Sequence, residues 1–463
     1  MTNTSSPSQN MYLAGSLPVL FAKTASPIIL IMLLNGLFTL VDAWFLGAFV
    51  GADALTGVTL MFPLYMLLVA LSTLVSSGFS SIYARRLGAG DHTEAGAVYG
   101  QAILLALVVC AVLIGLFLSG GSSLTLQVAN GSVVLANAGY TYISILILCS
   151  PLVFMLSINI DALRCEGLLR MMAAISVTSA FLNIGFDYIF VVEAGWGVAG
   201  SAWGTVLAQA CSVSAIICFR LLGKSSAVFR FSNIRPGWKH WGELLALGAP
   251  TSLGYIGVSL SAGLTIYCLQ LWAGESYEAT AGAFGIITRL MTFAFLPLLG
   301  ISMAFQTIAG NNFGAEKWQR SDNSLRTALV VAIVYCVGVQ TIFVSSRSVI
   351  GLIFVDDMAI VNEINRILPL ATFLLFLFGP LMMIATWFQA IGDAGRAALL
   401  GLSRTYLFAL PLTFALPFIF VEPGIWYGGI VAEVLVLLLT VVVLHRRAKR
   451  QGNHWGLFNY QSS

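Results

Sequence analysis

Long apolar segments separated by short polar loops follow one another along the whole chain. Twelve of these segments approach or exceed the roughly 20 apolar residues that a helix needs to cross a bilayer. They cover residues 22–50, 55–82, 96–118, 136–159, 170–192, 197–221, 243–272, 279–309, 327–346, 365–390, 397–420 and 425–444. The pattern predicts an all-α membrane protein with twelve transmembrane helices.

The longest polar stretch between spans, residues 222–242, divides the chain in two. We predict an N-terminal lobe over residues 1–221, a linker over 222–242, and a C-terminal lobe with a basic tail over 243–463. Each lobe would hold six helices.

The two halves also repeat weakly in sequence. Pro27 corresponds to Pro250, and Gly167 corresponds to Gly392. Six helices followed by six with the same orientation predict a parallel repeat related by a pseudo-two-fold axis along the membrane normal. Transporters with this architecture bind substrate between the lobes and rock them to alternate access.

The positive charges indicate the topology. With these spans, all but three of the 22 Lys and Arg residues lie on the same side of the membrane as the N-terminus; the exceptions are Arg289, Arg347 and Arg366. Positively charged loops remain in the cytoplasm. Both termini and the linker are therefore expected to be cytoplasmic.

Composition narrows the functional classes. With 59% hydrophobic and 9% charged residues, the chain does not have the composition of a soluble globule. A dispersed net charge of +3 gives no reason to expect a nucleic-acid partner. The scattered cysteines and histidines predict no metal centre. We also find no catalytic motif and no phosphate-binding loop in the spans, so we expect neither an enzyme nor a bound cofactor.

Carboxylates inside the spans are the candidate chemistry. Asp42 lies well within the first span, where a charge is costly unless it faces a bundle interior or a water-filled cavity. Asn183 and Asp187 are one turn apart on the fifth span, and Thr205 lies at a similar depth on the sixth. These four oxygen-bearing side chains should converge in the outer half of the N-terminal lobe. They could bind Na⁺ or share a proton, and the residues leave that choice open.

Three further residues carry predictions. Pro27 should bend the first helix, because its ring removes a backbone donor and clashes with the preceding turn. Glu433 in the C-terminal half corresponds to Thr205 in the N-terminal half. Arg289 is the cation that we place deepest within the spans of the C-terminal lobe. We hypothesise that Arg289 and Glu433 neutralise each other. The alternative is that both face the central cleft unpaired, with Glu433 in contact with cationic substrate.

Several motifs together resemble a known family. They are VDAWFLG in the first span, the Asn183 and Asp187 pair, GWGVAGSAWGT at the turn into the sixth span, AFQTIAGNNFGA at the end of the eighth and FQAIGDAGR after the tenth. From about Lys23 to His445 the chain resembles the multidrug and toxic compound extrusion family. It is more similar to the DNA-damage-inducible and archaeal-type branch, since the seventh and tenth spans lack the carboxylates of the Na⁺-coupled bacterial pumps.

The resemblance implies a function and a site. The chain would be a secondary antiporter in a bacterial inner membrane that exports amphipathic, often cationic, drugs in exchange for H⁺ or Na⁺. Asp42, Asn183, Asp187 and Thr205 would form its cation site, Pro27 would be the bend of the first helix, and a monomer is expected. The alternative is a lipid-linked oligosaccharide flippase of the same superfamily, which should line its lumen with several basic residues.

Overall fold

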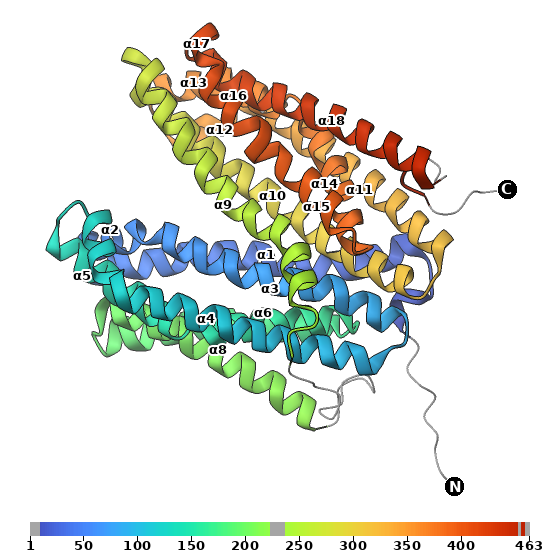
Figure 1. Cartoon of the computed structure of the whole chain (residues 1–463). Coiled ribbons are helices and arrows are strands. Elements are labelled where there is room, and N and C mark those ends of the chain that lie inside the picture. Colours follow the sequence, from blue (N-terminus) through green and yellow to red (C-terminus); the bar gives the residue numbers. More distant parts are fainter. Residues whose placement is uncertain (1–9, 223–236, 452–454, 459–463) are drawn as a thin grey trace. The chain divides into compact units, whose positions relative to one another are not determined.

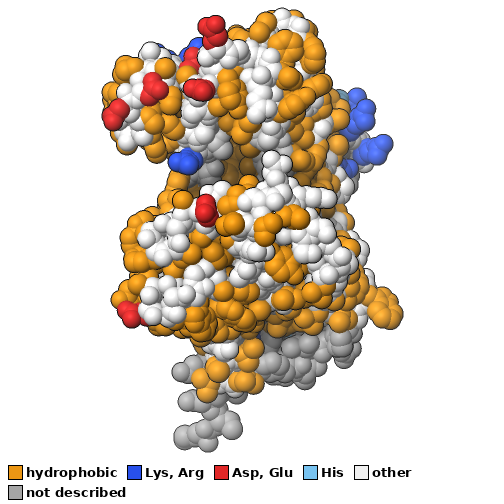
Figure 2. Space-filling view, turned by 90° about the vertical axis from the view of Figure 1, so that its left-hand side faces the viewer, with side chains coloured by type: hydrophobic (Ala, Val, Ile, Leu, Met, Phe, Trp, Pro, Cys, Tyr) orange, Lys and Arg blue, Asp and Glu red, His pale blue; other side chains and the backbone are white. Residues whose placement is uncertain are grey.

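The structure is a computed structural model that describes residues 10–222, 237–451 and 455–458. Helices account for nearly all of these residues (Figure 1). Hydrophobic side chains cover much of the face shown in Figure 2, and charged side chains are few on it. This surface suits a protein surrounded by lipid.

The first half of the chain contains six apolar spans. After a short 3₁₀-helix η1 (Met11–Leu13), they are α1 (Leu17–Phe45) continued by the π-helix η2 (Leu46–Val50); α3 (Phe62–Gly88), preceded by the shorter α2 (Ala52–Leu60); α4 (His92–Val128); the bent pair α5 (Val133–Leu148) and α6 (Ser150–Cys165); α7 (Leu169–Asp187) continued by the π-helix η3 (Tyr188–Glu193); and α8 (Gly197–Leu221).

The second half repeats this order. Its elements are α9 (Trp241–Trp272); η5 (Gly274–Ser276) and α10 (Tyr277–Gly314); α11 (Trp318–Ser345); a short α12 (Arg347–Phe354); the bent pair α13 (Met358–Thr372) and α14 (Leu375–Ala390); α15 (Ala394–Leu402), the π-helix η6 (Ser403–Ala409), α16 (Leu410–Ala415) and α17 (Pro417–Phe420) as one span; and α18 (Pro423–Gln451).

The number of spans agrees with the sequence. Ten helices in the described part of the chain are long and apolar enough to cross a membrane, and the two bent pairs raise the number to twelve. The pairs bend by 52° between α5 and α6 and by 42° between α13 and α14. One predicted boundary was wrong, since the second span begins at Phe62 rather than near residue 55. Pro63 in the first turn of α3 explains this start, because proline is favoured where the backbone N–H has no helical partner.

The turns between helices contain the helix caps and show the internal repeat of the two halves. Asp91 caps α4 by accepting from the backbone N–H of Glu94, and Asp393 caps α15 in the same way. The matched glycines Gly167 and Gly392 both adopt left-handed conformations, with φ of 82° and 87°. The two halves therefore share backbone geometry as well as sequence at this turn.

The chain forms two compact units. The first comprises Met1–Gly15 and Ser26–Ser252, and the second comprises Ser16–Ala25 and Leu253–Ser463. The first helix of each half is thus divided between the units, close to Pro27 in α1 and close to Pro250 in α9. These divisions differ from the predicted lobe boundaries, which kept both helices whole.

Close backbone contacts hold the start of α9 in the first unit. A Cβ added to Gly248 would lie 1.8 Å from the Leu74 carbonyl oxygen on α3, and one added to Gly78 would lie 1.9 Å from the Leu244 carbonyl oxygen. The Arg85 guanidinium pairs with the Glu243 carboxylate at 2.6 Å. Within the predicted linker 222–242, residues 223–236 lie outside the described residues.

Candidate functional site

Asp42 lies in the last turn of α1, one turn before the π-helix η2. Its side chain is partly buried, and its Oδ1 atom is buried without a hydrogen-bond partner among the described residues. A buried carboxylate oxygen without a partner is costly. Asp42 therefore has the features of a ligand-binding group rather than of a surface charge.

Asp187 is the last residue of α7 and directly precedes the π-helix η3. It is fully buried, and both of its carboxylate oxygens lack a hydrogen-bond partner within the described part of the chain. The carboxyl groups of Asp42 and Asp187 are close enough to interact with each other. Two helices thus bring two acids together, as the sequence predicted from their depth.

Gly204 on α8 makes the room for this pair. A Cβ at this position would lie 2.3 Å from Asp187 Oδ1, well inside any normal contact. The neighbouring Thr205 accepts a hydrogen bond at 3.2 Å from the side-chain Nδ2 of Asn183. All four predicted residues therefore lie in the first unit, as an acid pair and an amide–hydroxyl pair held by α1, α7 and α8.

Two tyrosines that the sequence analysis missed lie beside the acids. Tyr65 on α3 is within electrostatic range of Asp42, and Tyr142 on α5 is within range of both Asp42 and Asp187. Tyrosine is common in apolar spans, so nothing in the hydropathy pattern distinguishes these two. Their phenolic oxygens extend the polar surroundings of the acid pair.

Pro27 lies inside α1, which remains one helix from Leu17 to Phe45. The boundary between the two units falls directly before Ser26, next to this proline. The predicted bend of the first helix stays a prediction.

The prediction that Glu433 pairs with Arg289 was wrong. Glu433 on α18 accepts from Arg404 at 3.0 Å, whereas Arg289 is exposed on α10 and has no ion-pair partner among the residues that the structure describes. Sequence analysis counted Arg404 only as one of the cations on the cytoplasmic side, although it falls within the predicted eleventh span, residues 397–420. The structure places it in the π-helix η6 of that span, within reach of Glu433.

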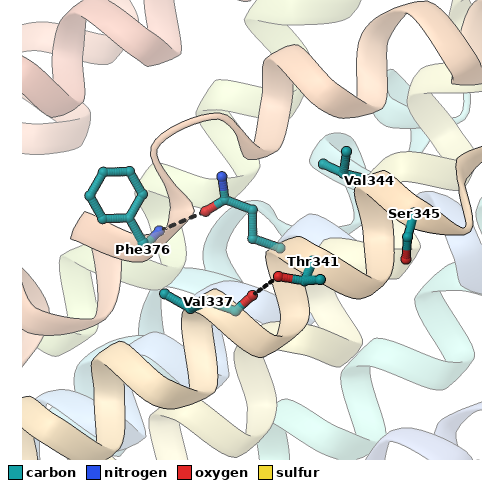
Figure 3. A pocket seen from close by; sticks show the side chains of 6 residues that line it. Val337, Thr341, Val344, Ser345 and Phe376 are labelled. Atoms are coloured by element: carbon teal, nitrogen blue, oxygen red, sulfur yellow. Dashed lines mark hydrogen bonds between the residues drawn. The ribbon is translucent and has the colours of Figure 1, made fainter.

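A further polar contact bridges the break between α13 and α14. Gln340 on α11 donates from Nε2 to the Phe373 carbonyl at 3.0 Å, and its Oε1 accepts from the backbone N–H of Phe376 at 3.2 Å. A cavity of about 430 Å³ lies beside this bridge (Figure 3), lined by Val337, Gln340, Thr341, Val344, Ser345 and Phe376. None of the predicted site residues lines it.

Comparison with known proteins places the chain in a family. The MatE family model matches residues 27–189 and 250–415, one segment in each half. The matched segments cover more than half of the chain and include Asp42, Asn183 and Asp187.

Two relatives are proteins named Multidrug export protein MepA. The one from Staphylococcus aureus (strain NCTC 8325 / PS 47) is 22% identical over 421 residues, which covers 90% of this chain and 91% of the relative. The one from Staphylococcus saprophyticus is 22% identical over 423 residues, with the same coverage of 90% and 91%.

Solved structures show the same fold. The outward-facing conformation of a multidrug resistance MATE family transporter of the MOP superfamily matches with a TM-score of 0.86 at 20% identity, covering 96% of this chain and 99% of that one. A MOP superfamily transporter from Pyrococcus furiosus matches with a TM-score of 0.83 at 21% identity, covering 94% and 97%. The predicted all-α membrane fold with twelve helices in two lobes is confirmed.

The family match spans both halves, and the relatives and structural neighbours are transporters rather than enzymes, as the sequence predicted. This multi-pass membrane chain belongs to the MatE family, the multidrug and toxic compound extrusion transporters.

Proposed function

We propose that this chain is a secondary active antiporter that exports amphipathic, often cationic, organic compounds in exchange for H⁺ or Na⁺. Export would proceed by alternating access between two lobes. The relatives named Multidrug export protein MepA support drugs as the substrate class. The observation that carries the proposal is the buried pair of acids, Asp42 and Asp187, on separate helices of the first unit.

The acid pair requires a positive charge. Two ionised carboxylates close together in a buried site repel each other and are poorly solvated. Neither Asp42 nor Asp187 forms an ion pair with a Lys, Arg or His within the described ranges. A proton or a metal cation from solution would supply the missing charge. Binding and release of that cation would then couple an ion gradient to transport.

Asn183 and Thr205 extend the ligand set. The amide nitrogen of Asn183 donates to the Thr205 hydroxyl oxygen. This hydrogen bond uses neither the amide oxygen of Asn183, which can still bind a cation, nor the hydroxyl hydrogen of Thr205, which can still be donated. Carboxylate, amide and hydroxyl oxygens are suitable ligands for a hard cation such as Na⁺. The same groups also stabilise a proton shared between the acids. The residues thus suit either ion.

The test is efflux of a fluorescent organic cation from proteoliposomes under an imposed pH gradient and, separately, an imposed Na⁺ gradient. We expect one gradient to accelerate efflux by native protein and neither to accelerate efflux by Asp42→Asn. Asp53→Asn is the matched control, because Asp53 lies exposed in the first turn of α2. Native protein that responds to neither gradient would contradict the antiport proposal.

Pro27 would act as the bending point of α1 during the cycle. The proline leaves the helix without one backbone hydrogen bond next to the division between units. Pro27→Ala should therefore slow gradient-driven efflux while the protein remains folded. Normal efflux by Pro27→Ala would show that the bend has no role.

We further propose a monomer in a bacterial inner membrane, where the bacterial origin of the relatives supports the location. The distribution of Lys and Arg residues supports placing both termini in the cytoplasm.

A further inference from the structure

π-helical segments adjoin three charged residues of the spans. The described residues contain three such segments: η2 begins one turn after Asp42, η3 begins directly after Asp187, and η6 contains Arg404. π-Helical segments are rare and occur frequently at functional sites. The first two accompany the acids of the candidate coupling site. The third lies in the second unit and directs attention to Arg404.

Arg404 lies between a carboxylate and an aromatic ring. Its guanidinium Nη2 atom is 3.0 Å from Glu433 Oε1 on α18, and its central carbon is 3.8 Å from the centroid of the Phe378 ring on α14. The Arg404 side chain is 18% exposed and that of Glu433 is 9% exposed. The three helices belong to the second unit, in which η6 packs against α18 (Figure 1).

A carboxylate beside an aromatic face is a recognition surface for organic cations. The ring face attracts a positive charge through its quadrupole, and the carboxylate neutralises that charge. Guanidinium is planar, delocalised and weakly hydrated, so it fits such a surface better than ammonium does. Arg404 presents these properties to Phe378 and Glu433. A planar organic cation would present the same ones.

We propose that Glu433 and Phe378 form a second ligand site, for planar delocalised organic cations, and that Arg404 occupies it until such a ligand arrives. The Arg404 side chain is the more exposed of the two, so an incoming cation would meet Arg404 first and displace its guanidinium. The displaced side chain would carry its charge toward solvent. This inference rests on the proposed export of cationic compounds, and it assigns them a site in the second unit.

Equilibrium binding without any ion gradient separates this site from the coupling site. The probe is ethidium, a planar aromatic cation, whose fluorescence anisotropy is measured with the purified full chain in nanodiscs. All variants carry Asp42→Asn in addition, so failure of the coupling proposal does not affect the measurement.

Removal of the internal competitor should tighten binding. We expect Arg404→Ala to bind ethidium at least about tenfold more tightly, which corresponds to about 1.4 kcal/mol. Adding Glu433→Gln should abolish this gain, and adding Phe378→Leu should remove most of it. Benzamidinium, a smaller planar cation, should compete with ethidium in Arg404→Ala.

Arg396 provides a matched control. It lies on α15 in the same span, pairs with Asp393 and has its guanidinium carbon 5.8 Å from the centroid of the Phe388 ring. Arg396→Ala should leave ethidium affinity unchanged. An equal gain from Arg396→Ala would refute the proposal, because the effect would then come from net charge.

A purely structural ion pair predicts a different result. In that case Arg404→Ala would lower the melting temperature with no gain in affinity, and this outcome would overturn the proposal. If Arg404→Ala does not fold, Arg404→Gln is compared with Arg404→Gln/Glu433→Gln, which buries no unpaired charge. The first should bind ethidium more tightly than the second, and equal affinities would likewise overturn the proposal.

Discussion

Gly204→Ala tests whether the position of the Asp187 carboxylate matters. The added Cβ would lie 2.3 Å from Asp187 Oδ1 and 3.2 Å from the Asp187 backbone nitrogen, whereas ordinary contacts begin near 3.4 Å. The carboxylate must therefore move by about 1 Å, or α7 and α8 must separate, at a cost of about 1–3 kcal/mol for overpacking. If that cost falls on cation binding, the affinity for the driving cation falls by about 5- to 150-fold.

The assay is gradient-driven efflux from proteoliposomes at a series of pH values or Na⁺ concentrations, with the half-maximal cation concentration as the readout. Gly185→Ala is the control, because Gly185 lies on α7 between Asn183 and Asp187 but a Cβ there meets no atom within 4 Å. A half-maximal concentration in Gly204→Ala equal to that of native protein would refute the argument that this glycine makes room for a coupling carboxylate.

Three further outcomes follow from the structure. Gly248→Ala should prevent folding or strongly lower the melting temperature, because its Cβ would lie 1.8 Å from the Leu74 carbonyl oxygen. Gly254→Ala should be tolerated, because a Cβ there has no atom within 4 Å. Equal stability of the two variants would contradict the close packing at Gly248. Gln340→Ala removes two hydrogen bonds at the break between α13 and α14 and should lower the free energy of unfolding by about 1–3 kcal/mol. An unchanged thermal or denaturant unfolding curve would show that these hydrogen bonds do not stabilise the protein. In a cysteine-free background, an impermeant thiol reagent should label Ser276→Cys but not Thr93→Cys on intact cells. The reverse pattern would contradict the predicted orientation in the membrane.

Much of the candidate site could be predicted from sequence because helical geometry is regular. Asn183 and Asp187 are one turn apart, and Asp42 and Thr205 lie at similar depths in their own spans, so counting residues along helices was enough to group them. The structure brings Asn183 to Thr205 and Asp42 to Asp187. That these residues couple an ion to transport is a proposal that rests on their chemistry.

Other features depend on local departures from the regular helix. Arg404 falls within the predicted eleventh span but was considered only as a cytoplasmic-side cation, because a sequence window reveals neither the π-helix η6 nor the contact of Arg404 with Glu433 on α18. The Arg289 pairing failed for this reason. The role of Gly204 was equally hidden, since a glycine in a membrane helix has many possible explanations and only the packed structure shows a carboxylate against it.

The central claim is that the acid pair exchanges a cation for the exported compound, and simultaneous recording of both fluxes tests it most directly. Proteoliposomes would carry an internal indicator of pH or Na⁺, and an organic cation would be added on one side only. Native protein should show a cation flux that starts with addition of the compound, opposes its movement and disappears in Asp42→Asn. Compound transport by Asp42→Asn at the native rate, with the same cation flux, would contradict the account.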